Sequence, residues 1–160
     1  MSVLQLPQAI YENLRAHGEE TYPRECCGAL LGRPIHGERS RDWRVSALVR
    51  ATNARGDAAS SAASDRYEIA PAELVRIAGE ARSLGLEIAG FYHSHPDHPA
   101  QWSAVDLAEA HWLGCSYVIT EVAFGKAAVT NAFLLAGSTE EEKRFEKQTI
   151  EIDNPGPAPV

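Results

Sequence analysis

The chain has 160 residues, of which 44% are hydrophobic and 23% charged, so its composition is that of a globular domain rather than a disordered segment. The formal net charge of −7, with no cluster of Lys and Arg, argues against a nucleic-acid partner. Apolar stretches are shorter than the roughly 18 residues of a membrane span, and no signal-peptide pattern is present, so we expect no membrane partner and a cytoplasmic location.

Helical and extended patterns alternate along the chain. Apolar residues at helical spacing after a proline or serine predict helices, whereas short apolar or alternating runs between turn residues predict strands. In chain order we expect a strand at 1–6, a helix at 7–20, strands at 26–32 and 43–49, a helix at 71–83, a strand at 87–95, a helix at 103–114, strands at 116–123 and 127–135, and a charged last helix at 139–148. This order predicts an α/β fold of the mixed α+β kind, in a single domain over residues 1–150.

Two segments are expected to lack regular structure. Residues 53–65 are small and polar and have little to bury, which predicts a mobile loop. Long loops in compact domains are often functional, so this one is a candidate for closing over a substrate. Residues 151–160 end in the run NPGPAPV, which cannot propagate regular structure and predicts a flexible tail.

The three cysteines are expected to be structural. Cys26, Cys27 and Cys115 cannot all pair within the chain, and adjacent cysteines rarely bridge each other. The first two begin an apolar run, where cysteine is commonly a small buried hydrophobe. The alternative, a redox or metal-binding thiolate, requires an exposed and electropositive site.

The stretch from His93 to Asp106 carries residue types suited to metal chemistry. Alternate side chains of a strand share a face, so His93 and His95 can offer imidazole nitrogens to one ion. A catalytic zinc takes three protein ligands and keeps one open position. Asp106 can be the third ligand if the chain turns at Pro96 and Pro99 and returns as a helix. Alone, a histidine pair of this spacing is a weak indication, because short matches arise by chance.

Ser103 precedes Asp106 by three residues, so on a helix both side chains project toward the same place. The serine hydroxyl would then be a neighbour of whatever the metal binds. The same spacing is also the signature of a helix N-cap, which implies no catalytic role. Both interpretations stay open at this point.

The combined pattern, HSHP followed by six residues, Ser, two residues and Asp, resembles the motif of the JAMM (MPN+) metalloproteases. These are zinc isopeptidases that include deubiquitinases of the proteasome lid and related bacterial and archaeal enzymes. The match is complete at His93, Ser94, His95, Pro96, Ser103 and Asp106. The resemblance implies a JAMM/MPN domain with a cytidine-deaminase-like mixed β-sheet flanked by helices. It also implies one Zn²⁺ per chain, bound by His93, His95 and Asp106.

Two further roles follow from this resemblance. The family places a Glu at the start of a buried strand as general base, and Glu25 stands there, while Ser103 corresponds to the residue that helps to stabilise the oxyanion. The chemistry is coherent, because zinc lowers the pKa of bound water to about 7 and polarises a carbonyl while a carboxylate accepts the proton. The alternative for Glu25 is a solvated surface acid. The neighbouring Glu19 and Glu20 are also acidic, and no fixed spacing to the histidines decides among the three.

A small stand-alone domain is similar to the bacterial branch of the family, which is associated with ubiquitin-like or sulfur-carrier proteins of the β-grasp type. We therefore expect a metallopeptidase or isopeptidase that hydrolyses an amide bond at the C-terminal Gly-Gly of such a protein or its adduct. An extended Gly-Gly tail is suited to a narrow groove and to pairing with a strand edge.

Two other functional classes fit the sequence less well. A non-catalytic MPN-type scaffold that binds proteins would typically have lost ligands, and every expected ligand is present. A zinc deaminase needs a PCxxC pair of thiolates, and the chain has no CxxC. His98 is expected to be an exposed loop residue or a contact near the metal, and His111 a packing or surface residue.

Overall fold

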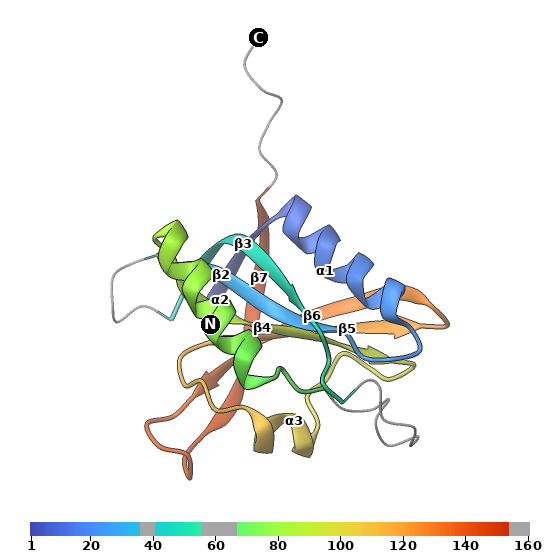
Figure 1. The fold of residues 1–160 in the computed structure, drawn as a ribbon. Coiled ribbons are helices and arrows are strands. Elements are labelled where there is room, and N and C mark those ends of the chain that lie inside the picture. Colours follow the sequence, from blue (N-terminus) through green and yellow to red (C-terminus); the bar gives the residue numbers. More distant parts are fainter. Residues whose placement is uncertain (36–40, 56–66, 154–160) are drawn as a thin grey trace.

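The computed structural model describes residues 1–35, 41–55 and 67–153 (Figure 1). Strands dominate, and the helices lie on the outside of them. In chain order the elements are β1 (Val3–Pro7), α1 (Gln8–Thr21), β2 (Cys27–Pro34), β3 (Trp43–Ala51), α2 (Pro71–Leu84), β4 (Glu87–Pro96), α3 (Ala104–Glu109), β5 (Ser116–Ala123), β6 (Lys126–Ala136) and β7 (Arg144–Asp153). Within the described residues, no helix has the length and apolar character needed to cross a membrane.

The strands form a closed barrel in the order β1-β3-β2-β4-β5-β6-β7. β1 runs parallel to both of its neighbours, β3 and β7, and β4 runs parallel to β5, whereas the other pairs are antiparallel. The predicted mixed α/β content is confirmed. Closure by pairing of the first strand with the last was not predicted, because the alternation within one strand does not reveal its distant partner. The closer likeness to a cytidine-deaminase sheet stays a prediction.

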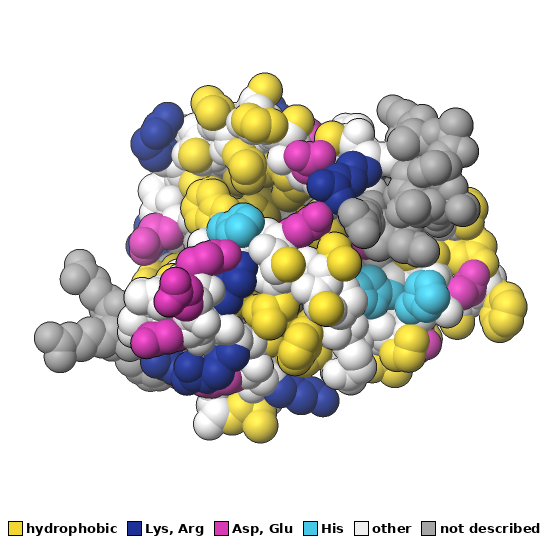
Figure 2. All heavy atoms as spheres, turned by 90° about the horizontal axis from the view of Figure 1, so that it is seen from below, with side chains coloured by type: hydrophobic (Ala, Val, Ile, Leu, Met, Phe, Trp, Pro, Cys, Tyr) yellow, Lys and Arg dark blue, Asp and Glu magenta, His cyan; other side chains and the backbone are white. Residues whose placement is uncertain are grey.

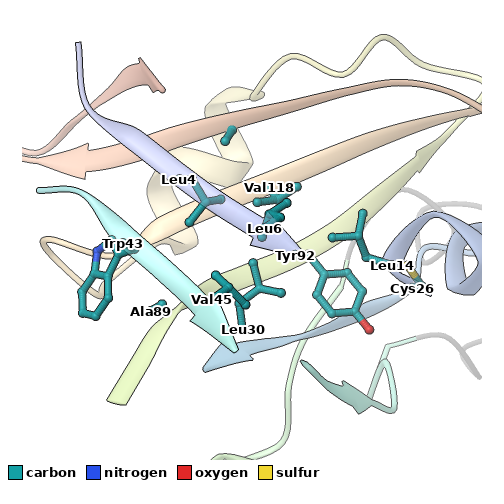
Figure 3. Packing of buried hydrophobic residues seen from close by; sticks show 11 residues of the cluster. Leu4, Leu6, Leu14, Cys26, Leu30, Trp43, Val45, Ala89, Tyr92 and Val118 are labelled. Atoms are coloured by element: carbon teal, nitrogen blue, oxygen red, sulfur yellow. The ribbon is translucent and has the colours of Figure 1, made fainter. Parts of the chain in front are cut away.

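The central strands are covered on both faces. Leu30 of β2 belongs to a core cluster with Leu4, Tyr92 and Val118, to which α1 contributes Leu14 (Figure 3). The flanking residues of the same strand, Ala29 and Leu31, point the other way, into a second cluster that α2 covers with Ile77 and Ala81. Burial on both faces explains why β2 is a continuous apolar run instead of an alternating one.

The helix predicted at 139–148 is wrong, because β7 occupies Arg144–Asp153. Both faces of this strand are partly covered: Phe145 packs against the second core cluster, and Gln148, on the opposite face, is buried. Hydrogen bonding to β6 on one side and β1 on the other stabilises the extended form over any helical preference.

Two predicted boundaries also differ from the structure. α3 ends at Glu109, well before the expected 114, and its backbone turns extended at Ala110. β7 includes residues 151–153, which had been assigned to the tail; the rest of the tail, 154–160, lies outside the described residues. Of the loop expected at 53–65, only residues 53–55 are described. By contrast, α2 ends where predicted, since Gly85 adopts the left-handed conformation that closes the helix.

Candidate active site

Strand β4 brings the two predicted histidines together. His93 and His95 lie two residues apart on β4, so their rings share one face of the barrel wall. Their Nε2 atoms are 3.1 Å apart, and both side chains are buried. The strand therefore delivers a pair of imidazole nitrogens to one point, as the spacing predicted.

The helix that follows supplies the carboxylate. Asp106 Oδ1 lies 3.3 Å from His93 Nε2, and Asp106 Oδ2 lies 3.2 Å from His95 Nε2. A capping box at the start of α3 holds this side chain: Ser103 N–H donates to Asp106 Oδ2 at 2.9 Å, and Asp106 N–H donates to Ser103 Oγ at 3.0 Å. The N-cap interpretation of Ser103 is thus confirmed, and the cap places Asp106 against both histidines.

The hydrogen bonds of the rings decide which nitrogen can bind a metal. His95 Nδ1 lies 2.8 Å from the carbonyl oxygen of Pro99, so Nδ1 carries a proton, and in the neutral ring Nε2 has the lone pair that can bind a metal. His93 Nδ1 is buried and has no hydrogen-bond partner among the described residues. The ring of Tyr67 stacks on His93 instead, with centroids 4.3 Å apart and planes at 21°.

These three donor atoms fit a zinc ion. A tetrahedral zinc with bonds of about 2.0 Å holds its ligand atoms about 3.3 Å apart. His93 Nε2 and His95 Nε2 are 3.1 Å apart, His93 Nε2 is 3.3 Å from Asp106 Oδ1, and His95 Nε2 is 3.2 Å from Asp106 Oδ2. Lone pairs at these distances repel one another unless a cation or a proton lies between them. Two imidazoles and one carboxylate are also a usual donor set for catalytic zinc.

The pKa values of the three residues are shifted in different directions. Burial lowers the pKa of His93, which keeps its ring neutral. Burial acts in the same direction on His95, but hydrogen bonds to Asp106 and to the Pro99 carbonyl outweigh it and raise the pKa. For Asp106, burial favours the neutral acid, yet the hydrogen bonds from His93 and His95 hold the pKa of the carboxyl well below its usual range. The carboxylate is therefore anionic.

Glu25 reaches the same place from the segment just before β2, the strand that pairs with β4. In the antiparallel pairing of β2 with β4, Cys27 is opposite His93, and Ser94 N–H donates to the carbonyl of Cys26 at 3.3 Å. The residue before them is thereby placed beside the histidines: Glu25 is 3% exposed, and its carboxylate lies within 4.8 Å of the ring nitrogens of His93 and His95. The interpretation of Glu25 as a solvated surface acid is wrong.

The remaining candidates lie apart from this centre or are inert. The three cysteines are buried and unbridged, and burial raises the pKa of Cys26 to about 11 and that of Cys115 to about 12, so neither thiol is a ready thiolate. His98 is exposed, as expected for a loop residue. His111 is exposed and faces Glu140, with 3.1 Å between Nδ1 and Oε1.

Two residues at the site were not predicted. Tyr67 stacks on His93, and Asn53 binds the backbone next to the acid: its Nδ2 donates to the carbonyl of Glu25 at 3.2 Å, and its Oδ1 accepts the N–H groups of Arg55 and Glu68, each at 3.0 Å. Asn53 is the first residue of the small polar stretch expected to be a loop, and Tyr67 lies just after that stretch. Proximity to an expected loop was the only signal in the sequence, and it does not distinguish these residues from their neighbours.

A cavity of about 330 Å³ adjoins the metal-binding residues. Tyr67 belongs to its wall, together with Phe91, Trp112 and Tyr117. The cavity lies on the side of the barrel that carries α3. Figure 2 shows this face, on which hydrophobic side chains gather beside acidic, basic and histidine side chains.

Comparison with known proteins gives one family. The family model described as prokaryotic homologs of the JAB domain matches residues 7–135. A relative from Haloferax volcanii, named desampylase, is 34% identical over 99 residues, which cover 61% of this chain and 62% of the relative. The match thus spans less than two thirds of that protein. A relative from Thermus thermophilus, named a probable TtuB-protein conjugate cleaving protease, is 30% identical over 138 residues, which cover 86% of this chain and 80% of the relative.

Two solved structures share the fold along nearly the whole chain. A protein from Desulfitobacterium hafniense superimposes with a TM-score of 0.72 at 25% identity, covering 96% of this chain and 95% of that one. A protein from Salinibacter ruber superimposes with a TM-score of 0.65 at 38% identity, covering 98% and 94%. The likeness therefore includes β7, which lies beyond the part matched by the family model.

Proposed function

Because the chain belongs to the family of prokaryotic homologs of the JAB domain, we propose that it is a zinc-dependent metallopeptidase that hydrolyses an amide bond. The observation that carries this proposal is the convergence of His93, His95 and Asp106, whose facing atoms are 3.1 to 3.3 Å apart, with the carboxylate of Glu25 next to them. These three residues would hold one zinc ion per chain.

When bound, zinc supplies Lewis-acid polarisation of the scissile carbonyl and makes water acidic enough to be deprotonated near neutral pH. Glu25 acts as general base and takes one proton from the attacking water, whose oxygen forms a bond to the carbonyl carbon. The carbon–nitrogen bond then breaks, and Glu25 returns the proton to the leaving amine. The buried position of Glu25 keeps its carboxylate away from bulk water and close to the reacting atoms.

Ser103 is proposed to stabilise the oxyanion that develops on the carbonyl oxygen. Its hydroxyl oxygen accepts the Asp106 N–H, which leaves the hydroxyl proton available to donate. The side chain is exposed at the start of α3, so a substrate can reach it. Donors of this kind contribute roughly 3 to 4 kcal/mol where one has been removed from other enzymes.

We propose that the substrate is a small ubiquitin-like or sulfur-carrier protein of the β-grasp type, cut after its C-terminal Gly-Gly or released there from a conjugate. The name of the Thermus relative states that it cleaves TtuB–protein conjugates, and that of the Haloferax relative, desampylase, also denotes removal of an attached group. Glycines at the end of such a tail let an extended backbone approach a buried metal closely.

The test combines metal content with turnover. Purified protein is analysed for zinc by elemental analysis and incubated with a β-grasp sulfur carrier whose Gly-Gly end is linked to a second group. One zinc per chain and release of the group support the proposal. A zinc-loaded protein that binds the carrier without cutting any linkage would instead be the non-catalytic scaffold.

A further inference from the structure

The cavity beside the metal-binding residues has aromatic walls and a polar rim formed by Arg55, Glu68, Glu109 and His111. Tyr67, Phe91, Trp112 and Tyr117 form its walls, and Ile69 and Leu74 add aliphatic surface. Its volume of about 330 Å³ exceeds what one or two water molecules require. A pocket of this size and lining, next to a proposed catalytic centre, is suited to an apolar group of a ligand.

The cavity is continuous with the candidate active site. Phe91 precedes His93 by two residues on β4, so their side chains share a face, and Tyr67 both lines the cavity and stacks on His93 at 4.3 Å. A substrate whose scissile amide lies at His93, His95 and Asp106 would therefore have an adjoining group within reach of the cavity.

Two buried rings form its inner wall. Phe91 and Tyr117 are 5% and 4% exposed, and their rings pack together with centroids 5.8 Å apart. Trp112 packs against Phe91 with centroids 5.3 Å apart but is itself 41% exposed, so it stands at the side that faces solvent. The cavity is thus a partly open pocket with an aromatic inner wall.

One cation at the rim is shared between two anions. Arg55 Nη1 lies 3.1 Å from Glu109 Oε1, and Arg55 Nε lies 3.4 Å from Glu68 Oε2. The guanidinium is engaged by both carboxylates, and these three groups together carry an excess of negative charge. The rim therefore disfavours an anionic group, while the aromatic and aliphatic walls favour an uncharged apolar one.

We infer that this pocket binds the side chain on the amine side of the scissile bond and selects a large apolar or aromatic residue joined to Gly-Gly through its α-amine. The inference rests on the proposed function and specifies its leaving group. Glycines on the acyl side have no side chain to fill the pocket. A lysine joined through its Nε brings only a methylene stem to this position, which buries less apolar surface against the rings than a Leu or Phe side chain does.

The first experiment measures selectivity. A β-grasp sulfur carrier is prepared with one residue X added after Gly-Gly, where X is Gly, Ala, Leu or Phe, and a fifth substrate carries Gly-Gly on the Nε of lysine. We expect kcat/KM for Leu and Phe to exceed that for Gly and for the Nε-linked lysine by about tenfold to a hundredfold, from burial of the side chain. Equal rates for all substrates, or preference for the Nε-linked lysine, would overturn the inference and leave the proposed function intact.

Variants locate the selectivity in the pocket. Trp112→Ala should reduce the ratio of kcat/KM for Phe over Gly, whereas Leu113→Ala should keep it. Leu113 is the matched control because it is the next residue, is exposed to a similar degree, at 38% against 41%, and does not line this cavity. A ratio that is unchanged in Trp112→Ala would contradict the assignment of the pocket.

A binding measurement separates failure of the pocket from failure of the enzyme. Phenylalaninamide and glycinamide are titrated into the zinc-loaded protein, and the indole N–H signal of Trp112 is followed by NMR, assigned with Trp112→Phe. Phenylalaninamide should shift this signal and glycinamide should not. Absence of a shift overturns the inference whether or not the protein cleaves anything, while a shift without any cleavage leaves the pocket standing and contradicts the proposed function.

Discussion

Asp106 Oδ2 accepts the backbone N–H of Ser103 at 2.9 Å and lies 3.2 Å from His95 Nε2, so a single carboxylate oxygen belongs both to a helix cap and to the candidate metal site. The orientation of Asp106 toward the histidines is thus determined by the first turn of α3. Substitutions in this turn should therefore affect metal binding and helix stability together, and these two effects need to be separated.

Ser103→Gly should separate the cap from the hydroxyl. Glycine at an N-cap costs only a few tenths of a kcal/mol, so α3 and zinc content should be kept, while loss of the hydroxyl should lower kcat about a hundredfold. Ser103→Ala lacks the same hydroxyl, and alanine, unlike glycine, is unfavourable at an N-cap. This should cost about 1 kcal/mol of stability and weaken zinc binding about tenfold. Zinc titration and steady-state kinetics distinguish the two variants. A Gly variant with full turnover would remove Ser103 from oxyanion stabilisation.

Glu25→Gln should keep the fold and the zinc but lose turnover by about a hundredfold to ten-thousandfold, because the amide cannot accept the proton of the attacking water. Glu20→Gln is the control: Glu20 is a nearby acid that is exposed and paired with Arg50 at 2.7 Å. Turnover is measured on a Gly-Gly-linked substrate beside elemental analysis. Activity retained in Glu25→Gln would exclude Glu25 as the base.

Zinc should stabilise the folded chain, since the three converging donors exist only in the folded state. At a free zinc concentration a hundred times the dissociation constant, the stabilisation is about 2.7 kcal/mol, which for a chain of this length raises the Tm by roughly 5 to 10 °C. Asp106→Ala should lose bound zinc and this response, whereas Glu109→Ala, on the same helix, should keep both. Thermal melts with and without a chelator provide the measurement, and unchanged zinc stoichiometry in Asp106→Ala would refute its role as ligand.

His17 should make stability depend on pH. Burial, assisted by Arg50, lowers its pKa from 6.5 to about 4, and its Nδ1 lies 2.7 Å from the hydroxyl of Tyr92. As the pH falls through this interval, the unfolded chain binds the proton first, so the free energy of unfolding decreases between about pH 6.5 and pH 4. Urea unfolding should show a shallower decrease in His17→Gln than in the wild type. Equal slopes in the variant and the wild type would contradict the prediction.

Asn53 is expected to position the general base through the backbone. Asn53→Ala removes the donor to the Glu25 carbonyl and the acceptor of two loop N–H groups, so kcat should fall about tenfold while zinc content is unchanged. Asn53→Asp keeps the acceptor but not the donor. If Asp restores the thermal stability lost in Ala but not kcat, the contact with Glu25 is the one that matters. Recovery of both would assign Asn53 to the loop alone.

The metal-binding part of the site could be predicted because its residues are close in sequence. His93 and His95 follow from the two-residue period of a strand, and Asp106 follows from the turn and helix directly after them. Tyr67 could not be predicted, since it reaches His93 across the sheet from a segment with no pattern of its own. The position of Glu25 depends on the register of β2 against β4, which a single sequence does not reveal.

Local patterns were similarly limited for the fold. Neighbouring residues alone predict the apolar strand β2 and the glycine that ends α2, and both predictions are confirmed. The sequence predicts a helix over residues 139–148 because charged residues dominate this segment. Pairing with β6 and β1 holds β7 extended, and the pairing with β1, which is distant in the chain, leaves no local pattern. Where a segment pairs with strands distant in the chain, this pairing outweighs its own preference for helix or strand.

The pairing of β1 with β7 has a consequence for biosynthesis. During translation β1 leaves the ribosome before its partner Thr149–Asp153, which follows the other strands of the barrel, so one edge of β1 stays without its neighbour until then. A chain that stops before Arg144 would keep this edge, and that of β6, open to other chains. Premature termination should accordingly produce aggregates instead of a smaller working enzyme.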